Sequence, residues 1–190
     1  IVPGGFGKRG TDGMILAADY ARKKKIPYFG LCFGMQLLTI AYARSVLGLE
    51  GANSTEIDLN TAHPVIATMV DQVDKIKNKN YGGTMRLGAY PANLKKGSIA
   101  GVAYGSSAIS ERHRHRYEVN PKYIAELEKA GLVFSGRSPD GVLMEIAELP
   151  KAVHPFYLGT QFHPEFKSRP MNPHPLFVAF MKSCVGKKEK

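Results

Sequence analysis

The sequence predicts an α/β fold in which helices flank a mostly parallel central sheet. A strand end at Ile1–Pro3 precedes a helical pattern, and an apolar run, Ile26–Leu31, precedes a second helical pattern from Gly34 to about Leu47. Alternation of strands and helices is typical of parallel sheets that are covered on both faces. Sites in such sheets lie at the carboxyl ends of the strands, so we expect the Gly4-Gly5 turn and Cys32 to be neighbours.

The first helix is expected to begin at Thr11 and Asp12, which can cap a helix. It ends in the basic run Lys23–Lys25, which suits the negative end of a helix dipole. Its buried face is predicted from apolar residues at helical spacing, namely Met14, Ile15, Ala18 and Ala21.

The later elements follow from shorter apolar runs and from turn residues. We predict strands at Pro64–Val70, 132–135, 142–147 and 156–162, a surface loop at 71–81, an extended segment at Gly82–Gly88, and helices at Asn120–Ala130 and Pro173–Val185, with Cys184 in the core. The order between Tyr90 and Ser110 is undecided. We expect residues 1–190 to form one domain, incomplete at its N terminus because Ile1 opens abruptly on a strand.

Composition excludes several classes of protein. No apolar stretch is long enough to span a membrane, and no signal segment opens the chain. Two cysteines make no disulfide framework, which indicates a reducing compartment, and we expect the cytoplasm. The formal net charge of +10 is spread over the sequence, so it favours solvated faces over a nucleic-acid surface.

Cys32 lies at the apex of a small-residue turn between the predicted strand and helix, which is the layout of a nucleophile elbow. Gly30 and Gly34 leave room for a tight turn. The helix N-terminus behind the sulfur is expected to lower the pKa of the thiol. A buried structural cysteine is the alternative.

A cysteine nucleophile needs a base and a group that orients the base. His163 ends an apolar strand, and Glu165 is two residues on, so both side chains can point the same way across Pro164. A carboxylate on one imidazole nitrogen fixes the tautomer.

A strand of alternating charge runs from Glu111 to Glu118. Alternation places Arg112, Arg114 and Arg116 on one face and the two intervening histidines, His113 and His115, on the other. Guanidinium groups grip carboxylates or phosphates bidentately, so an anion site is one reading and a face of surface ion pairs is another. We predict no metal site, because the histidines lack further ligands at suitable spacing.

These motifs together resemble a known family. Gly30-x-Cys32-x-Gly34-x-Gln36 followed by His163-x-Glu165 resembles the class I, or triad, glutamine amidotransferases, whose fold is flavodoxin-like. Further runs are similar to the amidotransferase domain of the CTP synthase family, and the likeness covers nearly the whole chain. These runs are Gly4–Gly7, Ala52–Glu56, Gly82–Gly88 and Glu111–Asn120.

The resemblance implies roles for residues of this chain. Cys32 would attack the glutamine carboxamide, His163 would serve as acid and base, and Glu165 would orient His163. Backbone N–H groups of Gly5 and Phe33 would form an oxyanion hole; Phe33 replaces the aliphatic residue common there, but only its N–H is needed. The implied glutamine-binding residues are Gly5, Phe33, Gly34, Met35, Gln36, Glu56 and Arg116. Arg9 is a candidate contact for GTP.

The resemblance also implies partners. Ammonia would pass to a synthetase domain, absent from residues 1–190, where ATP and Mg would activate UTP for conversion to CTP, with GTP as activator. No cofactor is expected in this domain. The intact protein is expected to be a homo-oligomer, a tetramer, with neither nucleic acid nor membrane as partner.

Two other functions compete with this one. A stand-alone γ-glutamyl hydrolase or peptidase of the same fold would use the same triad. A non-enzymatic basic domain that binds nucleic acid is the second rival, but the sequence lacks the basic–aromatic interleaving typical of RNA recognition.

Overall fold

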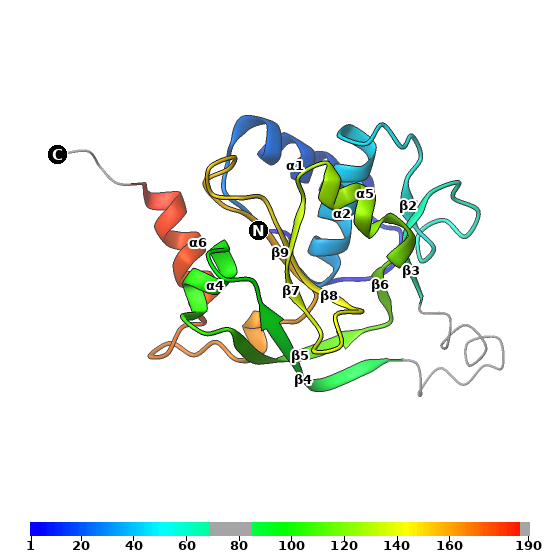
Figure 1. Ribbon diagram of the computed structural model, residues 1–190. Helices are drawn as coiled ribbons and strands as arrows, with labels where there is room; N and C mark the ends of the chain where they lie inside the picture. The colour runs from blue at the N-terminus through cyan, green and yellow to red at the C-terminus, as the bar shows by residue number, and fades with distance from the viewer. Residues whose placement is uncertain (69–84, 187–190) are drawn as a thin grey trace.

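A six-stranded sheet forms the centre of the fold (Figure 1), in the order β1-β9-β8-β7-β4-β5. The computed structural model describes residues 1–68 and 85–186. The strands of this sheet are β1 (Tyr28–Leu31), β4 (Arg86–Leu94), β5 (Ala108–His115), β7 (Val133–Arg137), β8 (Met144–Glu148) and β9 (Tyr157–Thr160). A smaller sheet consists of β2 (Asn53–Ser54), β3 (Pro64–Thr68) and β6 (Tyr117–Val119).

The pairing in the large sheet corrects the expectation of a mostly parallel arrangement. Strand β1 pairs in parallel with β9, and Val2 adds a parallel bridge to Gly30 on the other side of β1. The other four pairs of named strands are antiparallel. The connections from β7 to β8 and from β8 to β9 contain no crossover helix, and parallel pairing requires a long crossover. The opening strand–helix alternation therefore does not extend to the second half of the chain.

Helices cover both faces of this sheet (Figure 1). One face carries α1 (Thr11–Lys24), α2 (Phe33–Ser45) and α5 (Pro121–Lys129), and the other carries α4 (Ile99–Tyr104) and α6 (Pro175–Val185). Adjacent residues of β1 divide between the two cores, because Tyr28 belongs to the α2 side and Phe29 to the α6 side. Full burial of β1 on both faces explains why its sequence is an uninterrupted apolar run.

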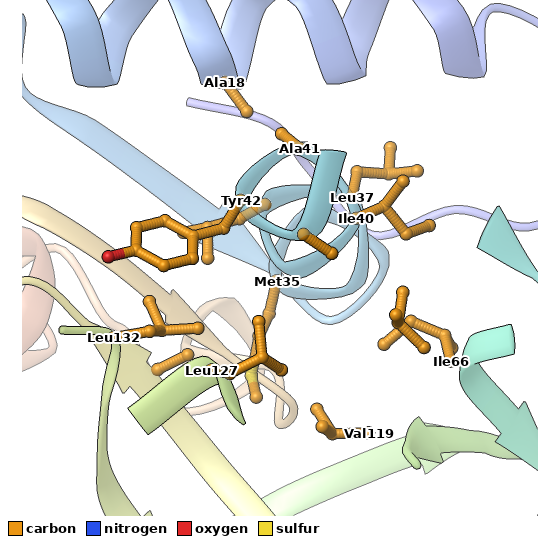
Figure 2. Close-up of a cluster of buried hydrophobic side chains, with 14 of the residues drawn as sticks. Ala18, Met35, Leu37, Ile40, Ala41, Tyr42, Ile66, Val119, Leu127 and Leu132 are labelled. Atoms are coloured by element: carbon orange, nitrogen blue, oxygen red, sulfur yellow. The ribbon is translucent and has the colours of Figure 1, made fainter. Parts of the chain in front are cut away.

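Helix α2 is the centre of the larger core. Every residue from Phe33 to Ala43 is buried, so the helix has no solvent face until its last turn. Figure 2 shows α2 end-on, with Ala18 of α1 opposite Ala41, and Leu127 and Leu132 beneath Tyr42. Two alanines at the contact let the helix backbones approach closely, which fixes α2 against the sheet. A helix buried on all sides holds its N-terminus, and therefore Cys32, in a defined place.

Two local expectations are wrong. The N-cap of α1 is Gly10 in a left-handed conformation without a side-chain cap, and the Thr11 hydroxyl donates to the carbonyl of Lys8 instead. Cys184 is exposed in the last turn of α6, whose buried residues, Leu176 and Phe180, lie nearer to the start of the helix. The predicted cap of α5 is confirmed, since the Asn120 side chain accepts from the N–H of Lys122.

Some expectations lie outside the described residues. These are the surface loop at 71–81, the end of the strand predicted to reach Val70, and the first half of the segment Gly82–Gly88. The undecided stretch from Tyr90 to Ser110 forms most of β4, the short helix α4 and the start of β5. Among the helices that the structure describes, none has the length and apolar character to cross a membrane.

Candidate active site

Cys32 occupies a strained turn between β1 and α2. Its φ of 48° and ψ of −97° lie outside the regions that L-residues ordinarily adopt. Its backbone N–H donates to the carbonyl of Thr160 at 2.6 Å, which continues the β1–β9 ladder by one bond. Strained backbone at the apex of a strand-to-helix turn is the signature of a nucleophile elbow, and it persists only where the surrounding structure enforces it.

The glycines on either side of Cys32 are required by close packing. A Cβ on Gly30 would lie 2.5 Å from the carbonyl carbon of Gly34, and one on Gly34 would lie 2.3 Å from the Val2 carbonyl oxygen. Both distances are far below van der Waals contact. The predicted tight turn is therefore confirmed, and the close approach is between backbone segments.

His163 and Glu165 form the hydrogen-bonded pair that the sequence predicts. Nδ1 of His163 lies 2.6 Å from Oε1 of Glu165. The ring stacks on Phe166 at 4.5 Å between centroids, and the backbone N–H of His163 donates to the Arg112 carbonyl of β5. The first two contacts hold the ring, and the third holds the backbone of His163. Nε2, its other nitrogen, is buried and has no hydrogen-bond partner among the described residues.

Cys32 and the His163–Glu165 pair line one cavity of about 510 Å³ at the carboxyl ends of β1 and β9. Gly4 lies between them, because a Cβ at Gly4 would fall 2.8 Å from Cε1 of His163 and 3.8 Å from Cβ of Cys32. The expected proximity of the glycine turn and the cysteine is therefore confirmed. The other residues of the wall are Pro3, Gly5, Phe6, Gln36, Glu56, Met85, Arg114, His115, Arg116, Tyr117 and Phe166.

The thiol pKa corrects the expectation of an activated thiolate. Burial of Cys32 raises the pKa of its thiol to about 12, and the charges of Glu118 and Glu165 add to the rise. Hydrogen bonds from the Phe33 N–H and from Gln161 lower the pKa but do not offset burial. Desolvation of the thiolate thus outweighs the helix N-terminus. Without substrate, the cysteine is a neutral thiol.

Two of the charged residues that line the cavity, Glu56 and Arg116, suit the ammonium and carboxylate groups of an amino acid. Glu56 accepts from the N–H of Gly7 at 2.9 Å, and its pKa is raised by burial although Gly7 and Arg116 oppose the rise. Gln36 donates to the Tyr117 carbonyl at 3.0 Å, while its own Oε1 is buried without a partner among the described residues. The residues that line the cavity therefore include a carboxylate, a guanidinium and a side-chain amide.

The structure places the remaining predicted site residues as follows. Gly5 lines the cavity, and a Cβ on it would lie 3.4 Å from the Phe33 ring. Phe33 does not line the cavity, although a hydrogen bond from its N–H lowers the pKa of the Cys32 thiol. Gly34 and Met35 do not line the cavity. The side chain of Met35, a residue of α2, is fully buried in the larger core. Arg9 is exposed and outside the cavity wall.

The alternation is confirmed within β5, where Arg112 and Arg114 are exposed and His113 and His115 are buried. The strand ends at His115, so Arg116 lies beyond it and Glu118 belongs to β6 of the smaller sheet. Nδ1 of His113 lies 2.9 Å from Nε2 of His115, and the pair lies against the carboxylates of Glu118 and Glu145. In the described part of the chain, no three His, Cys, Asp or Glu side chains form a group that could hold a metal.

Sequence reasoning missed one residue that contacts the Cys32 sulfur. Gln161 is fully buried, and its Nε2 donates to the Cys32 sulfur at 3.6 Å. The signal for it is a single amide in the apolar run before His163, two residues from the histidine and therefore on the same side of an extended chain.

Comparisons with known proteins agree with this geometry. The family described as "Glutamine amidotransferase class-I" matches residues 1–183. CTP synthase of Rubrobacter xylanophilus is 59% identical over 186 residues, which are 98% of this chain and 33% of that protein. CTP synthase of Thermomicrobium roseum is 59% identical over 181 residues, 95% of this chain and 32% of that protein. The chain thus spans about a third of the length of the curated relatives it matches.

A solved structure is similar as well. The Trypanosoma brucei CTPS glutaminase domain with bound acivicin superimposes with a TM-score of 0.89 and 41% identity, covering 97% of this chain and 69% of that one. The fold, the elbow and these matches show that the chain belongs to the class I glutamine amidotransferases. Within that family, its counterpart is the glutaminase domain of CTP synthases.

Proposed function

We propose that this domain hydrolyses L-glutamine to glutamate and ammonia through a cysteinyl thioester. The supporting observation is the shared cavity, which the strained Cys32, His163, Glu56 and Arg116 all line. Nε2 of His163 is buried and has no hydrogen-bond partner in the described part of the chain. A nucleophile, an oriented base and a pair of opposite charges are the parts that attack on an amino-acid carboxamide requires.

Acylation begins from the neutral thiol. Nε2 of His163 takes the proton as the Cys32 sulfur attacks the carboxamide carbon, so a free thiolate is not needed beforehand. The N–H groups of Gly5 and Phe33 receive the developing oxyanion, a contribution of about 3–4 kcal/mol per donor in comparable sites. His163 then gives the proton to the leaving ammonia. Glu165, on Nδ1, holds the tautomer that both transfers require.

Deacylation repeats the sequence with water. His163 takes a proton from water, the hydroxide attacks the thioester carbon, and Cys32 leaves with the returned proton. The products are glutamate and the regenerated thiol.

Recognition of the substrate is assigned to charged and polar residues that line the same cavity. Arg116 suits the α-carboxylate, because a guanidinium binds a carboxylate through two parallel hydrogen bonds. Glu56 suits the α-ammonium, and the unsatisfied Oε1 of Gln36 offers a further acceptor. The same wall would serve a γ-glutamyl compound, so substrate choice between glutamine and γ-glutamyl peptides is a part of the test.

The wider role extends beyond these residues. We propose that the ammonia passes to a synthetase domain of the same polypeptide, where ATP and Mg activate UTP and CTP forms, with GTP as activator and a tetramer as the assembled form. The curated relatives are about three times longer than this chain, which leaves room for such a domain. We propose the cytoplasm as its location.

Ammonia release from glutamine tests the proposal. Cys32→Ala is expected to abolish release in the full-length polypeptide, whereas Cys184→Ser, which alters the exposed cysteine, is expected to leave it unchanged. Unchanged ammonia release from Cys32→Ala would refute the proposed catalytic triad. Faster cleavage of γ-glutamyl peptides than of glutamine would favour the hydrolase instead.

A further inference from the structure

A directed chain of hydrogen bonds ends on the sulfur of Cys32. It starts at the Tyr117 carbonyl of β6, passes through the side-chain amide of Gln36 on α2, and continues to Gln161 after β9. The distances are 3.0 Å from Gln36 Nε2 to the Tyr117 oxygen, 3.4 Å from Gln36 Nε2 to Gln161 Oε1, and 3.6 Å from Gln161 Nε2 to the Cys32 sulfur.

The direction of the chain is fixed by its first member. A backbone carbonyl can only accept, so Gln36 must turn its NH₂ group toward Tyr117. The second hydrogen of that NH₂ then requires an acceptor, which is Oε1 of Gln161. Gln161 is left with only its own NH₂ facing Cys32. Both glutamines are at least 98% buried.

We propose that Gln161 is a catalytic residue whose side-chain N–H stabilises the negative charge that develops on the Cys32 sulfur, and that Tyr117 orients it through Gln36. This inference rests on the proposed function for its role in turnover, but its effect on the sulfur is independent of substrate.

Several features of the site disfavour a negative charge on the Cys32 sulfur, and a hydrogen-bond donor at Gln161 counteracts them. Glu118 of β6 and Glu165 of the turn η2 (Pro164–Phe166) both raise the pKa of the Cys32 thiol, as does burial. His163, Arg114, His115 and Arg116 also line the cavity. Gln161 is a neutral donor that favours the charged sulfur without adding a formal charge, and a hydrogen bond to a charged group is stronger than one to a neutral group.

The rate of alkylation of Cys32 by iodoacetamide tests the proposal. The experiment uses the full-length polypeptide with Cys184→Ser, because the exposed Cys184 would also react. Gln161→Met keeps an unbranched side chain of similar length and removes the donor. We expect it to lower the alkylation rate about tenfold at every pH from about 6 to about 9, as a smaller thiolate fraction requires.

Gln161→Glu is the second variant, in case the first does not fold. It keeps the acceptor for Gln36 but replaces the donor by an acceptor, and we expect an equal or larger fall in rate. Thr39→Val is the matched control, because it removes another fully buried polar group of the same core, one that donates to the Met35 carbonyl and not to the sulfur. The control is expected to react as the parent does.

Turnover of glutamine supplies a second readout. If Gln161 acts on the developing charge, kcat falls about tenfold in Gln161→Met while KM stays within about twofold. Alkylation at the parent rate in a folded Gln161 variant overturns the proposal, and so does an equal fall in Thr39→Val. If the parent protein releases no ammonia but Gln161→Met is alkylated more slowly than the parent, the role of Gln161 is retained and only the proposed function is refuted.

Discussion

Gly4 lies directly against the imidazole of His163, where a Cβ at residue 4 would be 2.8 Å from Cε1 of the ring. The ring cannot withdraw freely, because Phe166 stacks on it and Glu165 holds Nδ1. The absence of a side chain at Gly4 therefore sets the position of the His163 ring, the proposed general base.

Gly4→Ala is accordingly expected to displace the base without unfolding the protein. Misplacement of a catalytic group by about 1 Å can lower kcat about 10²-fold. Steady-state glutaminase kinetics measure the effect, and a thermal melt checks that the fold remains. A variant with parental kcat would show that the ring has room to move.

Glu165→Gln is expected to lower kcat by about 10²–10⁴-fold while KM changes little, because an amide can stabilise the wrong tautomer of His163 and cannot balance the imidazolium. Ammonia release at saturating glutamine measures kcat. A fall in affinity alone would place Glu165 in binding and not in orientation.

Strain at Cys32 predicts an unusual order of stabilities. With φ at 48° and ψ at −97°, any L-residue at position 32 is strained, whereas glycine is not. Cys32→Gly is therefore expected to be more stable than Cys32→Ala, by about 1 kcal/mol. Urea denaturation of the two inactive variants gives the difference. Greater stability of the alanine variant would contradict strain at the elbow.

Substitution by alanine is expected to destabilise the protein at one helical glycine and to stabilise it at another. In Gly34→Ala the new Cβ would lie 2.3 Å from the Val2 carbonyl oxygen, so we expect a loss of more than about 2 kcal/mol. Gly13 of α1 is exposed and has nothing within 4 Å of its Cβ position, so Gly13→Ala is expected to stabilise by about 0.5–1 kcal/mol. Equal effects in chemical denaturation would refute the packing argument.

The buried carboxyl of Glu118 makes stability depend on pH. Burial raises its pKa from 4.5 to about 8, Glu145 adds to the rise, and Arg86 opposes it. The stability from this group is thus fully present below about pH 4.5 and is lost as pH rises through about 8. Glu118→Gln is expected to lessen the loss of stability between about pH 5 and about pH 8, by at most about 1.4 kcal/mol per pH unit.

Denaturation midpoints at several pH values measure this effect. Glu126→Gln, which neutralises an exposed carboxyl on α5, is the matched control and is expected to keep the parental slope. If Glu118→Gln also keeps that slope, Glu118 does not titrate in this range.

The sequence alone predicts those parts of the site whose position depends only on residues that are close together along the chain. Cys32 follows a strand and opens a helix, and His163 and Glu165 are two residues apart, so their placement needs no knowledge of distant contacts. The alternation of buried histidines and exposed arginines in β5 is local for the same reason.

Properties that depend on distant packing could not be predicted in this way. The thiol pKa is set by burial and by Glu118 and Glu165, which the fold brings to Cys32. Antiparallel pairing of β7, β8 and β9 depends on the turns between them and not on the apolar runs. The donor at Gln161 becomes visible only when Gln36 and Tyr117 are placed beside it.

The parallel pair β1–β9 also has a kinetic consequence. Gln161 is 129 residues from Cys32 along the chain, and both positions extend the same four-residue ladder. Closing so long a loop is slow compared with forming local helices. During synthesis, the thiol therefore meets neither its base nor its amide donor until the last strand emerges. Glutaminase activity should thus appear late in folding, and its recovery after dilution from urea should lag behind the recovery of helix signal.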